Sequence, residues 1–116
     1  MSDSKYVPRD FCTDPSMFGR RGGRPQWRED LTSSTDLDQL AASQAQHRYA
    51  QQIRAFIKGR FRTVRNYSDM NELNYARISR MLRGEIVMTL VDVVAAERML
   101  PGVFDLLKER VGRLGA

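Results

Sequence analysis

Apolar side chains recur at helical spacing in the middle of the chain. Between residues 46 and 62 they fall three or four positions apart, on one face of a helix, at Ile53, Phe56, Ile57 and Phe61. Because residues 41–58 contain neither Gly nor Pro, this stretch is the clearest helix prediction in the sequence.

Polar residues upstream predict where this helix begins. Ser34 or Thr35 can cap it, and Asp36 and Asp38 place carboxylates in a first turn, where they favour the helix dipole. Residues 36–45 are less apolar, so they are compatible either with a separate short helix or with an exposed extension of the same one.

Further helical patterns follow this stretch. One ends at Gly84 and has an apolar face at Ile78, Met81 and Leu82. The next starts at the cap residue Thr89 and stops at Pro101, and a last one from Val103 has apolar positions at Phe104, Leu107, Val111 and Leu114. Since no repeat and no long strand-like alternation interrupts them, we expect an all-α fold of about five helices.

Residues 1–34 differ from the rest of the chain. They hold most of the prolines and show no sustained period, which predicts an extended, partly disordered N-terminal arm ahead of a helical domain at 35–116. The arm also has four aromatic residues, more than a plain linker, so parts of it are expected to pack on its own domain, a second copy or a partner: Tyr6, Phe11, Phe18 and Trp27.

Composition narrows the classes of function. The formal net charge is +5, with 19 Lys and Arg against 14 Asp and Glu, which suits a polyanionic partner such as nucleic acid. Cys12 and His47 are single residues of their kind, so the chain supplies neither an internal disulfide nor a Cys/His zinc set. We find no nucleophile, base and orienter set and no Walker-type loop, and so expect no enzyme activity, metal or cofactor.

No apolar run approaches the roughly 20 residues of a bilayer crossing, and "MSDSKYVPRDF" lacks the apolar core of a signal peptide. We therefore expect no membrane partner and a cytoplasmic, nucleoid-associated protein.

The stretch "TVRNYSDMNELNYARISRMLRG", residues 63–84, resembles the helix-turn-helix of the phage-repressor and Cro-like (XRE-type) family. Thr63 and Asn74 stand at the two cap positions and Ser68 at the small-residue position where the helices cross. The family's terminal pattern is matched by Ile78, Ser79, Arg80, Met81, Arg83 and Gly84. The resemblance covers about residues 50–100 and implies a lambda-repressor-like bundle that binds double-stranded DNA.

Three positions depart from the family pattern. Glu72 occupies a turn position that is often Gly, so we expect Asn71 to take the left-handed conformation there. Tyr67 replaces a smaller aliphatic residue, and Val64 stands where the family has a Gln that contacts phosphate.

By family position, the helix at 74–83 would enter the major groove. Candidate base contacts are Asn74, Tyr75, Ala76, Arg77, Ser79 and Arg80, with Arg77 equally suited to phosphate. Candidate phosphate contacts are Arg62, Thr63, Arg65 and Arg83. Taken alone, the arginines of this stretch indicate only a solvated helical face, but together with the caps and the terminal Gly they favour DNA.

Residues 19–27, "GRRGGRPQW", resemble the centre of an AT-hook, although two glycines separate its arginines. Two interpretations remain: a flexible basic turn, or minor-groove insertion of Arg20, Arg21 and Arg24.

The sequence thus favours a dimeric, repressor-like transcriptional regulator that acts by occupying DNA. In related repressors a helix after the DNA-binding unit often forms the two-fold contact, which predicts a homodimer. The alternative is an antitoxin or adaptor that grips a protein partner with its aromatic arm.

Overall fold

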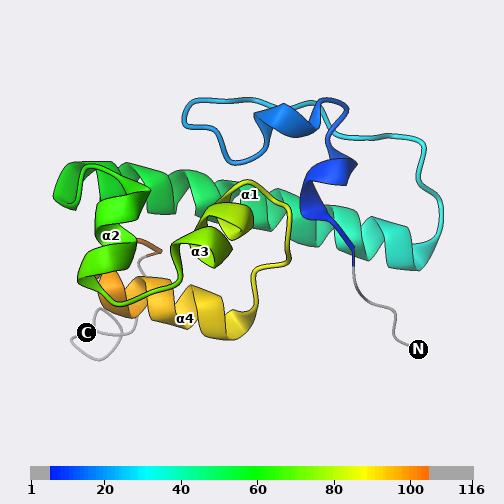
Figure 1. The fold of residues 1–116 in the computed structure, drawn as a ribbon. Helices are drawn as coiled ribbons and strands as arrows, with labels where there is room; N and C mark the ends of the chain where they lie inside the picture. The colour runs from blue at the N-terminus through cyan, green and yellow to red at the C-terminus, as the bar shows by residue number, and fades with distance from the viewer. Residues whose placement is uncertain (1–5, 105–116) are drawn as a thin grey trace, which may run out of the picture.

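One long helix, α1 (Ser34–Arg60), runs along the molecule, and the other elements pack around it (Figure 1). The computed structural model describes residues 6–104. Its other elements are η1 (Pro8–Phe11) and η2 (Pro15–Met17), two short 3-10 helices, and α2 (Val64–Met70), α3 (Tyr75–Leu82) and α4 (Leu90–Met99). Within these residues the only strand-like pairing is an isolated bridge between Cys12 and Trp27, so the predicted all-α class is confirmed.

The structure describes four α-helices, where the sequence predicted about five. The last predicted helix starts at Val103, and its part from residue 105 on, with Leu107, Val111 and Leu114, lies outside the described residues. Phe104, its first predicted apolar position, packs against Tyr49 of α1 with ring centroids 4.6 Å apart.

Residues 36–45 belong to α1 as a continuous extension and not to a separate helix. The cap is Ser33, so the prediction of Ser34 or Thr35 was wrong by one or two positions. Ser33 has an extended backbone and its side chain accepts the Asp36 N–H at 3.0 Å, whereas Ser34 is already helical. Although α1 has 27 residues, neither it nor any other helix in residues 6–104 is apolar enough to cross a bilayer.

The predicted caps of the three later helices are confirmed. Thr63, Asn74 and Thr89 each have an extended backbone, and each side chain accepts an N–H from the first turn of its helix. Gly84 ends α3 with φ +76°, and the Gly84 and Glu85 N–H groups donate to Met81 and Arg80 carbonyls at 3.2 and 2.9 Å.

The turn between α2 and α3 corrects one expectation. Glu72 itself takes the left-handed conformation, with φ +56°, whereas Asn71 has φ −106°. The reason is the hydrogen bonding of the helix end: Glu72 and Leu73 donate to Asp69 and Ser68 carbonyls, which places the left-handed residue at position 72. The Asn71 side chain instead donates to the Tyr67 carbonyl at 2.9 Å.

Residues 6–33, which we call the N-terminal segment, pack on the helical core. The sequence predicted that their aromatic residues pack on the chain's own domain, a second copy or a partner, and the structure shows the first of these. Phe18 is only 3% exposed, and Phe11 and Trp27 also pack inward. A Cβ at Gly84 would lie 2.6 Å from the Phe18 ring, so this segment fits closely against the end of α3. Position 34 therefore marks a change of secondary structure, not an edge of the core.

Candidate nucleic-acid interface

α3 has one buried face and one exposed face. Met81 and Leu82 are buried and Ile78 packs against the core, while Ala76 and Arg80 lie on the opposite side and are exposed. Tyr75 is 38% exposed at the first turn. Since the inner face is fixed by packing, the outer side chains are presented on a rigid support.

Two of the candidate residues also cap helices. Asn74 Oδ1 accepts the Arg77 N–H at 3.0 Å, and Thr63 Oγ1 accepts the Asn66 N–H at 3.0 Å. Both side chains are exposed and keep donor hydrogens, the Asn74 amide and the Thr63 hydroxyl. Each can therefore hold its helix and donate to a ligand at once.

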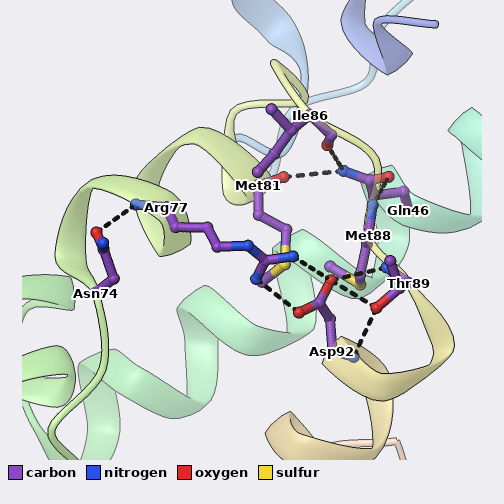
Figure 2. A network of polar contacts seen from close by, with 8 residues as sticks. All are labelled: Gln46, Asn74, Arg77, Met81, Ile86, Met88, Thr89 and Asp92. Carbon is purple, nitrogen blue, oxygen red and sulfur yellow. Dashed lines mark hydrogen bonds and ion pairs between the residues drawn. The ribbon is translucent and has the colours of Figure 1, made fainter. Parts of the chain in front are cut away.

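Arg77 is separated from the other candidates. Its guanidinium donates to both Asp92 oxygens of α4, at 2.7 and 3.0 Å, and Asp92 also completes the capping box of α4 with Thr89 (Figure 2). Burial alone would raise the pKa of Asp92, but hydrogen bonds from Arg77 and Thr89 outweigh it and the pKa is lowered. The structure thus places Arg77 between α3 and α4, not on the outer face.

Ser79 and Arg83 are hydrogen-bonded to each other at the end of α3. Arg83 Nη1 donates to Ser79 Oγ at 2.7 Å, and Arg83 Nε donates to Glu85 at 2.7 Å. The hydrogen bond from Arg83 is the main cause that lowers the pKa of Glu85. In contrast, Arg80 makes no ion pair within residues 6–104.

The start of α2 adjoins the start of α3. The Arg65 guanidinium lies 4.7 Å from the centre of the Tyr75 ring and 3.8 Å from Asp69. Arg62 and Arg65 are both exposed. Three candidate phosphate contacts, Arg62, Thr63 and Arg65, therefore lie on the surface near Tyr75, the first residue of α3.

The segment that resembles an AT-hook is a tight turn. The Gly23 N–H donates to the Arg20 carbonyl at 3.0 Å, with Gly22 at φ +71°, and Gln51 of α1 donates to the Arg20 and Gly23 carbonyls. The structure thus holds a basic turn against α1. Arg20 and Arg21 line one cavity together, and Arg21 also lines a second one with Arg24.

Sequence reasoning missed Gln46, a buried side chain that holds α3 in place. Its amide donates to the Met81 and Ile86 carbonyls at 3.0 and 2.9 Å, and its oxygen accepts the Met88 N–H at 2.8 Å (Figure 2). A Gln in a polar stretch of helix carries no signal of this kind, because its partners are backbone groups 35 to 42 positions away.

Cys12 and His47 are buried in the packed interior. Burial raises the pKa of the Cys12 thiol to about 11, which disfavours the reactive thiolate. His47 Nδ1 accepts the Gly19 N–H at 2.8 Å, and the imidazole packs edge-to-face against the rings of both Phe18 and Trp27. Burial, with a smaller effect of Arg48, lowers the pKa of His47.

Comparison of the chain with protein-family models, curated proteins and solved structures found no match.

Proposed function

We propose that the protein is a sequence-specific DNA-binding regulator whose helices α2 and α3 act as a helix-turn-helix of the phage-repressor type. One observation carries the proposal. α3 buries an apolar face while it presents Ala76 and Arg80 outward, and Arg80 has no ion-pair partner within residues 6–104. A rigid helix with a free arginine on its outer face suits entry into the major groove.

The exposed side chains divide by role. Arg80 can bridge guanine O6 and N7, Ala76 can contact a thymine methyl, and Tyr75 and Asn74 can bond to base edges. Arg62, Arg65, Thr63 and Arg83 flank this face and can hold phosphates. Binding would regulate transcription by occupying a promoter.

The proposal includes a second copy of the chain. α4 exposes Leu90, Val91 and Val94 by 83%, 78% and 60%, and adjacent exposed apolar side chains suit a protein contact. A two-fold dimer would present two α3 helices to successive half-sites of DNA. Sedimentation equilibrium of the full chain should detect a dimer that Val91→Asp weakens; a monomer at every concentration would contradict this part of the proposal.

The alternative of an antitoxin or adaptor has lost its main support. It rested on four aromatic residues in the N-terminal segment that lacked an explanation. Phe11 and Phe18 are buried within the chain, Trp27 packs on the core, and Tyr6 lies 5.8 Å from Phe11 in an edge-to-face pair. A partner is therefore not needed to account for them.

The decisive experiment measures binding of the folded protein to duplex DNA from its own upstream region, by fluorescence anisotropy over a range of salt concentrations. Arg83→Ala should weaken binding to all sequences and reduce the salt slope by about 1. Arg80→Ala should cost about 1–3 kcal/mol of binding and also relax the preference at particular base pairs.

Arg48→Ala is the matched control, because it removes the same charge from an exposed site on α1 that does not line the apolar surface of α4. Negligible duplex affinity at low salt for the folded protein would overturn the proposal. So would equal effects of Arg80→Ala and Arg48→Ala.

A further inference from the structure

Five arginines from three parts of the chain line one cavity of about 420 Å³, which we call the arginine cleft. Arg54 comes from α1, Arg83 from the end of α3, and the N-terminal segment contributes Arg9, Arg20 and Arg21. Phe18, Pro15 and Ser16 complete its lining.

Negative charge in and around the cleft is scarce. Glu85 contacts Arg83 at 2.7 Å and Arg9 at 3.8 Å, while Arg20, Arg21 and Arg54 make no ion pair within the described residues. Asp14 lies nearby in sequence, but its side chain accepts the N–H and hydroxyl of Ser16. The cleft therefore keeps three guanidinium groups without a carboxylate partner, which costs free energy through mutual repulsion unless an anion binds.

Arg54 is the group for which this cost is clearest. Its Nε is buried and has no hydrogen-bond acceptor. Burial and the nearby charge of Arg83 both lower the pKa of Arg54. A buried guanidinium N–H without an acceptor is rare in folded proteins, and an anion with several oxygen atoms would satisfy it.

We propose that the arginine cleft is a binding site for a phosphate group, with Arg54 at its inner side and Arg20 and Arg21 from the fixed turn. One guanidinium group can donate two parallel hydrogen bonds to two oxygens of a phosphate. Phe18 and Pro15 limit access of water on one side of the cleft, which strengthens such hydrogen bonds. Gln51 holds the carbonyls of Arg20 and Gly23, so the turn is ordered before a ligand arrives.

The expected source of the phosphate is the DNA backbone, and to that extent the site rests on the proposed function. Arg83 lines the cleft and also donates to Ser79 on α3, so the cleft adjoins the helix proposed to enter the groove. A backbone phosphate beside that groove would lie within the same basic region. A free phosphorylated small molecule has the same chemistry and is distinguished by the experiment.

The test uses inorganic pyrophosphate and the full-length protein. NMR spectra of the arginine Nε–H groups are recorded as pyrophosphate is added at constant ionic strength. We expect saturable shifts in the wild type and a roughly tenfold or greater loss of affinity in Arg54→Gln and in Arg21→Gln. Arg21 is exposed, so Arg21→Gln should retain the fold even if Arg54→Gln does not. Arg48→Gln, at an exposed site of α1 outside the cleft, is the charge-matched control.

Competition with duplex DNA then identifies the source. If pyrophosphate displaces the duplex, and both cleft variants weaken duplex binding more than Arg48→Gln does, the ligand is a backbone phosphate. If pyrophosphate binds in the cleft but the duplex does not bind or does not compete, the site holds a free phosphorylated molecule. Absence of saturable pyrophosphate binding, or equal affinity in Arg21→Gln and Arg48→Gln, would overturn the site whatever the result with DNA.

Discussion

Arg77 and Asp92 form a bidentate ion pair that joins α3 to α4, with N–O distances of 2.7 and 3.0 Å. The Asp92 side chain is 11% exposed and that of Arg77 is 45% exposed, so the pair lies at the edge of the core. Asp92 also accepts the Thr89 N–H at 2.8 Å. The pair thus fixes the position of α3 through the cap of the next helix.

We expect this pair to affect stability more than base preference. A double-mutant cycle of Arg77→Met and Asp92→Asn should give a coupling of about 1 kcal/mol in urea unfolding. In DNA binding, Arg77→Met should leave the base preference unchanged, whereas Arg80→Met should relax it. A change of preference in Arg77→Met equal to that in Arg80→Met would show that Arg77 leaves Asp92 to contact bases.

Gln46 should be the most sensitive polar residue of α1. Gln46→Ala removes the partners of three backbone groups, at Met81, Ile86 and Met88, and should lower the free energy of unfolding by about 2–4 kcal/mol. Gln52→Ala, an exposed Gln of the same helix, serves as the control and should change it by less than about 0.5 kcal/mol. Urea denaturation measures both, and similar effects would contradict the role of Gln46.

Substitution of two glycines with similar backbone angles can distinguish the cost of backbone strain from the cost of a steric clash. Gly22 and Gly84 have φ of +71° and +76°, but a Cβ at Gly22 meets nothing within 4 Å, whereas one at Gly84 meets Phe18 at 2.6 Å. Gly22→Ala should cost about 1 kcal/mol through backbone strain. Gly84→Ala should cost a further 1–3 kcal/mol or so because the ring must shift. Equal melting temperatures of the two variants would contradict the packing of Phe18 on α3.

Glu72 offers a substitution that stabilises the protein. Its left-handed backbone is unfavourable for a residue with a Cβ, and its side chain is exposed. Glu72→Gly should therefore raise the free energy of unfolding by about 0.5–1 kcal/mol, since relief of strain exceeds the entropy cost of Gly. Glu72→Ala keeps the strain and should give no gain. A destabilised Glu72→Gly would mean that this carboxylate has a role in the turn.

Stability should fall as pH drops below about 6.5, the ordinary pKa of His. The pKa of His47 is lowered in the folded protein, so the unfolded chain binds a proton more readily. The stability that is fully present above the ordinary pKa is therefore lost as the pH falls through the pKa of His47 in the folded protein. His47→Asn keeps an acceptor for the Gly19 N–H but does not titrate. Its melting temperature should vary less than that of the wild type between pH 7 and 5, and parallel curves would contradict this origin.

Local chemistry let the sequence predict the helical parts of the fold. Thr63, Asn74 and Thr89 cap their helices as predicted because a side-chain oxygen satisfies N–H groups only two or three residues away. Gly84 ends α3 for an equally local reason, its freedom to adopt positive φ. The buried and exposed faces of α3 followed from helical spacing alone.

Contacts between distant residues decided the rest. The N-terminal segment has little regular structure, yet Phe18 is in the core because it meets Gly84 across 66 positions of sequence. The same approach brings Arg20 and Arg21 to Arg54 and Arg83, and the ion pair with Asp92 takes Arg77 off the outer face. Helical spacing determined which residues share a helix face; only packing between segments determined which arginines share a cavity, because side-chain periodicity carries no information on contacts between separate elements.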